Sequence, residues 1–250
     1  LTATLVPPCI TIVIQLCEML LSLEEGVKSF SVSFSQTGSM IQDIVTANVL
    51  RKMAKHYAEQ IGCGDAMINL VYHQWMGAFP SNKDYSESLI NTSTVIASMV
   101  RADKIITKTR DEAFGIPTRE SNAKTVANTQ YTLKMLQGIP NISGEQEEEI
   151  VTSEVMSIME AVFNDKADTL WRKVFNSIKA GIIDVPYSPH IINNNEVVTV
   201  RDKNKNIRII KRGNLPISDR CFEYEKAQCD LNKDASSIVN DIIHDIGIMQ

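Results

Sequence analysis

The feature of the sequence that most constrains its fold is a strand-like segment that recurs about every 37 residues. The segments SFSVSF (29–34), AMINLVYH (66–73) and DKIITKT (103–109) each have the composition and the length of a β-strand. Strands joined by connections this long pair in parallel, because the intervening residues are enough for a crossover helix. The repeat therefore predicts an α/β fold with a parallel sheet covered by helices.

Amphipathic segments fill the intervals between these strands and continue after the third. The expected helices, in chain order, cover 9–23, 39–61, 84–102, 118–138, 143–165 and 168–181. Thr118 and Ser121 can cap the start of the fourth helix. Beyond them, residues 182–190 are either a final strand or a loop that enters the core. A hairpin around a polar turn is expected over 196–213 and a helical tail over 218–246.

Composition excludes several classes of function. A formal net charge of -5 argues against a nucleic-acid partner, which usually meets a basic face, and no apolar run reaches the length of a membrane span. The five cysteines are scattered without a CxxC pair, as in reduced cytoplasmic proteins, and the four histidines are not spaced to complete a metal site. The chain begins at Leu1 without a signal peptide, so we expect a piece of a longer polypeptide.

Three strand–helix units are too few for a closed eight-stranded barrel. The expected fold class is α/β, either as a partial (β/α)8 TIM barrel that corresponds to its C-terminal half or as a smaller open sheet. The start at Leu1 instead of methionine favours the half barrel. We place this half barrel in residues 1–190. Residues 191–250 form the expected C-terminal extension, which consists of a β-hairpin and helix.

Three unusual segments follow the three predicted strands, and loops at the carboxyl ends of parallel strands carry function in such folds. They are SQTGSMIQD (35–43), HQWMGAFP (73–80) and KTRDEAFGIPT (108–118). The aromatic residues of the second loop are either a buried plug or the wall of a ligand site. In the second case Phe79 and Met76 could sandwich a flat ring, while His73 or Gln74 supplies a hydrogen bond.

Lys108 and Glu112, in the third loop, have more than one possible role. They could form an ordinary surface ion pair worth less than about 1 kcal/mol. Strand alternation, however, predicts that Ile106 and Lys108 point towards the barrel axis while Ile105 and Thr107 face the helices. An inward ammonium and carboxylate could grip a polyol such as a ribose. A lone lysine there could instead be a Schiff-base nucleophile.

The segments LTATLVPP, GSMIQD, VYHQWMGAFP and KTRDEAFGIPTRESNA together closely resemble the epsilon subunit of glutamate mutase, also called methylaspartate mutase, and the likeness covers essentially the whole chain. The resemblance implies an adenosylcobalamin-dependent isomerase that interconverts L-glutamate and (2S,3S)-3-methylaspartate by a radical mechanism. It also implies a heterotetramer in which an epsilon-subunit dimer pairs with small cobalamin-binding sigma subunits. The sigma subunit carries a D-x-H-x-x-G motif. Residues 241–247 only partly match that motif, because Ile242 stands in place of the aspartate.

In the family, the lysine and glutamate of the KT-x-x-E motif hold the adenosyl ribose, which assigns this role to Lys108 and Glu112. The resemblance also places Phe79 and Ile116 along the coenzyme, with His73 and Met76 as neighbours. Arg110 and Asp111 stand where the resemblance leads us to expect a Pro-His pair. No catalytic residue is assigned, because the family's substrate-binding residues are expected upstream of Leu1.

Two further hypotheses stay open at this point. One is a Schiff-base lyase or aldolase on the same barrel, with Lys108 as its nucleophile. The other is an inactive, truncated product that survives as a binding module, for which the exposed sheet edge of a half barrel would need a partner.

Overall fold

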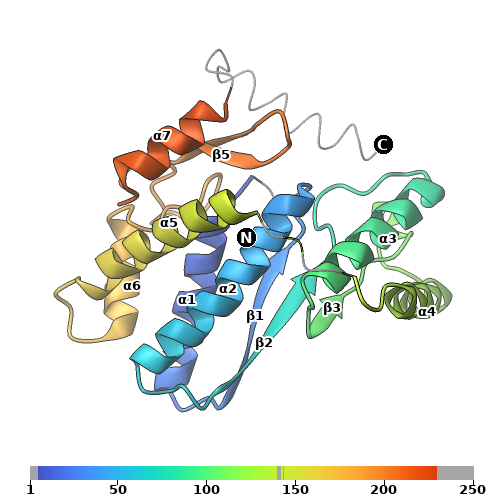
Figure 1. Cartoon of the computed structure of the whole chain (residues 1–250), viewed down its shortest axis with the longest axis horizontal. Helices are drawn as coiled ribbons and strands as arrows, with labels where there is room; N and C mark the ends of the chain where they lie inside the picture. The colour runs from blue at the N-terminus through green and yellow to red at the C-terminus, as the bar shows by residue number, and fades with distance from the viewer. Residues whose placement is uncertain (1–4, 140–141, 143, 230–250) are drawn as a thin grey trace.

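The computed structural model describes residues 5–139, 142 and 144–229, and it confirms the parallel repeat (Figure 1). Strands β1 (Ser29–Ser35), β2 (Met67–His73) and β3 (Lys104–Ile106) form one sheet in the order β1-β2-β3. Both strand pairs are parallel. The carboxyl ends of the three strands therefore lie at one edge, where the three unusual loops begin.

The helices begin and end close to the predicted positions. In chain order they are α1 (Pro8–Glu24), α2 (Met40–Gln60), α3 (Lys83–Met99), α4 (Arg119–Met135), α5 (Glu145–Phe163), α6 (Leu170–Lys179) and α7 (Asp219–Ala227). Side-chain caps explain several starts, since Ser39, Asn82 and Thr118 each accept a hydrogen bond from a backbone N–H of the first turn. The predicted cap at Thr118 is thereby confirmed.

The two faces of the sheet differ in character. Val32 and Phe34 of β1, with Leu70 and Tyr72 of β2, are buried in one apolar core with residues of α1, α2 and α3. Because side chains alternate along a strand, the neighbouring positions face the other way. The register pairs Ile105 with Tyr72, on the helix-covered face, and Ile106 with His73, on the opposite face. The prediction that Ile105 faces the helices is therefore confirmed, and Ile106 points to the opposite face. That this face lines the axis of a barrel stays a prediction.

The third strand is shorter than we predicted. It ends at Ile106, so Lys108 lies two residues beyond the strand and does not end it. The side chain of Gln74 competes with the β-ladder at this point. Its Oε1 accepts a hydrogen bond from the backbone N–H of Lys108 at 2.9 Å. The prediction of a strand over 103–109 was wrong at its carboxyl end.

Residues 182–190 form a loop that enters the core, and the alternative prediction of a strand was wrong. Ile183 and Asp184 are buried there. The carboxylate of Asp184 accepts hydrogen bonds from the backbone N–H groups of Glu196 at 2.7 Å and Val197 at 2.9 Å. These bonds satisfy a charge that would otherwise be costly to bury.

The predicted hairpin is present as β4 (Val198–Arg201) and β5 (Ile207–Lys211), which pair antiparallel. Figure 1 shows the hairpin and α7 together beside α5 and the N-terminal end of α2. The helical tail is confirmed only over α7, since residues 230–250, and with them the 241–247 segment, lie outside the described residues. None of the described helices combines the length and the apolar character that a membrane crossing requires.

Candidate functional site

Two of the three loops close around a pocket of about 340 Å³ at the carboxyl edge of the sheet. The loop after β2 and the loop after β3 provide its walls. The residues that line it are Trp75, Met76, Gly77, Ala78, Phe79, Lys108, Glu112 and Ala113. The sequence-predicted residues Phe79, Met76, Lys108 and Glu112 are thus brought together, although up to 36 positions separate them in the chain.

Lys108 and Glu112 face each other across the pocket wall. Nζ of Lys108 lies 3.6 Å from Oε2 of Glu112, and each side chain retains about a quarter of its exposure, 25% and 24%. A short turn places the glutamate, since its Oε1 accepts from the backbone N–H of Thr109 at 3.3 Å. A separation of 3.6 Å is longer than a hydrogen bond. The ammonium therefore keeps donors, and the carboxylate keeps lone pairs, for a third group.

The apolar wall is built around a buried indole. Trp75 is 2% exposed, and its Nε1–H donates to the carbonyl oxygen of Ala78 at 2.9 Å, which closes the loop on itself. The backbone of Gly77 passes directly over the ring, because a Cβ at that position would stand 2.7 Å from Cζ2 of Trp75. Met76 stays 45% exposed at the rim. Trp75 is therefore a buried plug, whereas Met76 is exposed and Phe79 is partly buried beside the pocket. That the loop forms the wall of a ligand site stays a prediction.

Gln74 cannot serve the ligand as we predicted. Its side chain is fully buried, and Nε2 donates to the carbonyl oxygen of Ile90 at 3.2 Å and to Oγ1 of Thr94 at 3.1 Å. Its Oε1 accepts from the backbone of Lys108. Gln74 instead ties the ends of β2 and β3 to α3 and so fixes the point from which the lysine side chain projects.

His73 and Ile116 lie outside the pocket that holds Lys108. His73 lines a second, larger cavity of about 700 Å³ with Met76, α1 and the 178–193 segment. Burial, and then the charge of Lys108, lower the pKa of His73. Ile116 is 98% exposed on the loop after β3. Its role beside the coenzyme stays a prediction.

Arg110 and Asp111 turn away from the pocket. Nη1 of Arg110 lies 3.5 Å from Oε2 of Glu87, and Oδ1 of Asp111 lies 2.9 Å from Nζ of Lys83. Both partners belong to α3. The hydrogen bond from Lys83 is the leading cause that lowers the pKa of Asp111. Where the sequence departs from the expected Pro-His pair, it therefore anchors the loop to α3, and neither residue lines the pocket.

Asp43, in the first turn of α2, is a buried carboxyl that we did not predict. Its Oδ1 accepts from the backbone N–H of Thr37 at 2.8 Å and from its hydroxyl at 2.7 Å. Its Oδ2 has no hydrogen-bond partner among the described residues. Burial raises the pKa of Asp43 to about 7. No short sequence motif signals this state, because it depends on how α2 closes over the loop after β1.

A family model described as the methylaspartate mutase E chain (MutE) matches residues 1–237. A glutamate mutase epsilon subunit from Treponema denticola is 36% identical, with 91% of this chain and 48% of the relative covered. Another from Escherichia coli O157:H7 is 35% identical, with 98% and 53% covered. A third from Halobacterium salinarum is 30% identical, with 94% and 49% covered. The chain thus spans about half the length of the curated relatives it matches.

Proposed function

The chain belongs to the methylaspartate mutase E chain family, the epsilon subunits of glutamate mutase, and we propose that it supplies the coenzyme-side half of that enzyme's site. The reaction proposed for the complete enzyme is the adenosylcobalamin-dependent isomerisation of L-glutamate to (2S,3S)-3-methylaspartate. The observation that carries this proposal is the juxtaposition of Lys108 and Glu112 with the wall around Trp75.

The pocket suits the adenosyl part of the coenzyme. Each ribose hydroxyl is both a donor and an acceptor, so one vicinal pair can accept from the ammonium of Lys108 and donate to the carboxylate of Glu112. The two charged groups are close enough for such hydroxyls to bridge them, and too far apart to form a hydrogen bond with each other. Met76 and Phe79 offer apolar surface to a flat base. A volume of about 340 Å³ lies in the range of small-molecule sites.

The proposed role of these residues is placement. When bound, adenosylcobalamin supplies the one-electron carbon chemistry that side chains cannot provide. Lys108 and Glu112 would hold the sugar in one orientation, and the wall of Trp75, Met76 and Phe79 would keep water from the reacting carbon. Such positioning lowers the activation free energy, because the reacting groups are already aligned when the reaction begins. A Schiff-base nucleophile would need a free amine, whereas the Nζ of Lys108 lies beside a carboxylate.

The fold proposed for residues 1–190 is the C-terminal half of a TIM barrel, with residues 191–250 as an extension. Two observations support it. The relatives are about twice as long, and β3 has a strand neighbour on one side only among the described residues. An unpaired edge of this kind calls for a partner strand. The partners proposed for the complete enzyme are a small cobalamin-binding sigma subunit and a second epsilon subunit.

Calorimetric titration of the purified chain with 5'-deoxyadenosine tests the proposal, because this nucleoside carries the ribose and base without the cobalamin. We expect binding, and we expect Lys108→Met and Glu112→Gln each to weaken it about tenfold to a hundredfold, the value of one hydrogen bond to a charged group. Lys104→Met removes an exposed lysine from β3, the strand that leads to Lys108, and is the matched control. Absence of binding, or an equal loss in the control, would refute the assignment.

A second measurement separates the lyase hypothesis from this one. Borohydride treatment in the presence of a carbonyl substrate would attach that substrate to Lys108 if the lysine formed a Schiff base. We expect no adduct at Lys108. An adduct would favour the lyase.

A further inference from the structure

We propose that Arg201, at the end of β4, is a positioning residue for the coenzyme pocket, because it holds the loop after β1 against the rear of Trp75. Its relevance to the coenzyme rests on the proposed function. The packing of the loop against Trp75 does not depend on the proposed function, and it can be tested separately. No motif in the sequence connects the hairpin with the rim loops.

The guanidinium of Arg201 is a buried clamp. Its exposed fraction is 2%, and Nη2 donates to the carbonyl oxygen of Thr37 at 2.7 Å. Nη1 donates to the carbonyl oxygen of Lys205 at 2.7 Å, across the turn of its own hairpin. One side chain therefore joins the hairpin turn to the loop that follows β1.

Gly38 lies between this clamp and the indole. A Cβ built on Gly38 would stand 3.6 Å from Nη1 of Arg201 and 3.6 Å from Cζ3 of Trp75. The backbone of the loop is thus packed between the two groups. Its φ of 96° is a conformation that glycine adopts readily and other residues adopt at a cost.

Trp75 transmits this placement to the pocket. Its indole lines the pocket, and its hydrogen bond to Ala78 sets the path of the backbone that leads to Phe79. Gly77, which also lines the pocket, crosses the ring at a distance that leaves no room for a methyl group. If the loop behind the indole withdrew, the ring could tilt, and the wall formed by Ala78 and Phe79 would move with it.

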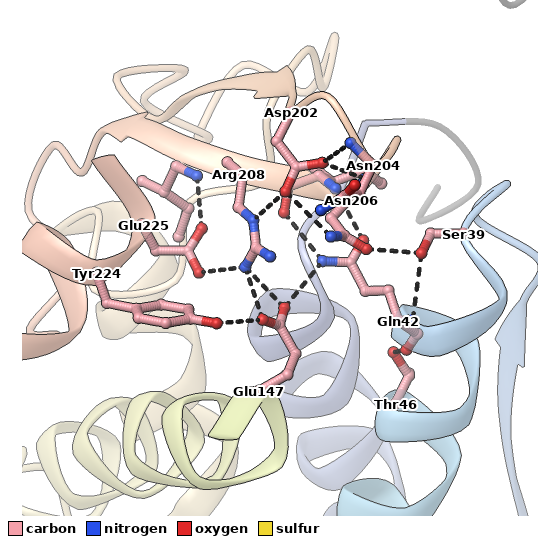
Figure 2. A network of polar contacts seen from close by, with 12 residues as sticks. Ser39, Gln42, Thr46, Glu147, Asp202, Asn204, Asn206, Arg208, Tyr224 and Glu225 are labelled. Atoms are coloured by element: carbon pink, nitrogen blue, oxygen red, sulfur yellow. Dashed lines mark hydrogen bonds and ion pairs between the residues drawn. The ribbon is translucent and has the colours of Figure 1, made fainter. Parts of the chain in front are cut away.

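The hairpin is stiff enough to act as a fixed support. Figure 2 shows Arg208 at the centre of a buried network. Its Nε donates to Oδ2 of Asp202 at 2.9 Å, and its Nη1 lies 2.7 Å from Oε1 of Glu147, on α5. Asp202 directly follows Arg201, and its Oδ1 also accepts from the backbone N–H of Asn206 at 3.0 Å. The turn that carries the clamp is therefore held from several sides.

The same hairpin is docked on the start of α2 (Figure 2). The hydroxyl of Ser39 donates to Oδ1 of Asn206 at 2.6 Å. Gln42 pairs with the backbone of Ile207, donating to its carbonyl oxygen at 3.1 Å and accepting from its N–H at 2.8 Å. Ser39 is the N-cap of α2 and lies two residues after Thr37. The hairpin thus contacts the loop through Arg201 and the start of α2 through Asn206 and Ile207.

Fluorescence of Trp75 tests the clamp without any ligand. The chain has two tryptophans, and Trp171 is 55% exposed on α6, so a Trp171→Phe background leaves Trp75 as the reporter. In that background Arg201→Lys keeps the charge but cannot span both carbonyl oxygens with a planar fork. We expect a red-shifted emission and an acrylamide quenching constant raised about twofold or more. We expect the dissociation constant for 5'-deoxyadenosine to rise about tenfold, because a displaced wall would fit the nucleoside less well.

Arg212→Lys is the matched control on the same hairpin. Arg212 bonds to the carbonyl oxygen of Ile217 and to Asp219, and neither lies on a rim loop. This variant should leave the fluorescence of Trp75 and the affinity unchanged. A response as large as that of Arg201→Lys would overturn the proposal.

The outcomes separate the two proposals. Unchanged fluorescence in Arg201→Lys would overturn the clamp, and altered fluorescence with unchanged affinity would overturn its role in the pocket. If the parent chain does not bind 5'-deoxyadenosine, the proposed function fails, and fluorescence alone decides whether Arg201 holds Trp75. Should Arg201→Lys not fold, Gly38→Ala places a methyl group between the same two side chains. Its failure to alter the emission of Trp75 would overturn the clamp equally.

Discussion

Two groups of charged side chains differ in how much of their hydrogen-bonding capacity is already used. At the pocket, Lys108 and Glu112 stand 3.6 Å apart and each keeps about a quarter of its exposure. In the hairpin network, Arg208 is 3% exposed and meets Glu147, Asp202 and Glu225 at 2.7, 2.9 and 3.2 Å. The first group is left available to a ligand, and the second is satisfied within the protein.

The difference is also one of energy. Burial opposes the charge of Arg208, but the carboxylates of Glu225 and Glu147 outweigh that cost and raise the pKa of Arg208 above its ordinary value. Such a group contributes stability only while its partners remain in place. The pair at the pocket keeps about a quarter of its exposure and is partly solvated, so little stability depends on it. Support is thus assigned to the hairpin network, and the recognition that we propose is assigned to the pair at the pocket.

The largest expected effect comes from removing the centre of the hairpin network. Arg208→Met leaves three buried carboxylates without their common cation, and we expect the free energy of unfolding in urea to fall by about 3–5 kcal/mol. Arg172→Met, which removes a half-exposed arginine from α6, should change it by less than about 0.5 kcal/mol. A loss below about 1 kcal/mol in Arg208→Met would remove the contrast between the two groups.

The next effect is a pH dependence set by Asp43. Burial raises its pKa from 3.8 to about 7, so the folded chain holds a proton that the unfolded chain releases above about pH 4. The stabilising contribution of this carboxyl is complete below about pH 4 and is lost as the pH rises through 7. We expect the free energy of unfolding, relative to Asp43→Asn, to fall by up to about 4 kcal/mol between pH 4 and 8. A pH-independent difference would contradict the buried, unpaired carboxyl oxygen.

A smaller effect is expected at the pocket wall. Gly77→Ala forces a methyl group to within 2.7 Å of the indole of Trp75, and overpacking of this kind costs about 1–3 kcal/mol. It should also weaken binding of 5'-deoxyadenosine. In the control Gly64→Ala the new methyl group comes closest, at 3.0 Å, to Cγ of the flexible side chain of Glu59. Urea unfolding of both variants measures the difference, and equal stabilities would argue against a tightly packed wall.

The smallest effect on stability belongs to the pair at the pocket. Lys108→Met should change the free energy of unfolding by less than about 1 kcal/mol, because the pair is partly solvated and its atoms lie beyond hydrogen-bond distance. Thermal or urea unfolding checks this value. A loss comparable to that of Arg208→Met would mean that Lys108 supports the fold and is not reserved for a ligand.

Local patterns were sufficient to predict the parallel repeat and the hairpin. They also predicted that three loops follow the carboxyl ends of the strands, and two of these loops line the pocket of Lys108 and Phe79. Local patterns failed where a distant side chain decides the outcome. The segment 103–109 has strand composition throughout, but Gln74 takes the N–H of Lys108 and ends the ladder. The contact of Arg201 with Thr37 spans 164 positions, and no periodicity relates them. Ile116 shows that a motif alone does not determine the environment of a residue. It occupies the expected position in the motif, but its 98% exposure could not be predicted from that position.

The central claim is that Lys108 and Glu112 hold the hydroxyls of a ribose. The most direct test compares the affinity of 5'-deoxyadenosine with that of an analogue lacking both ribose hydroxyls, for the parent chain and for the Lys108→Met/Glu112→Gln double variant. We expect removal of the hydroxyls to weaken binding to the parent chain about a hundredfold, and to the double variant less than about threefold. An equal loss for both proteins would show that the hydroxyls are held elsewhere, or not at all, and would contradict the account.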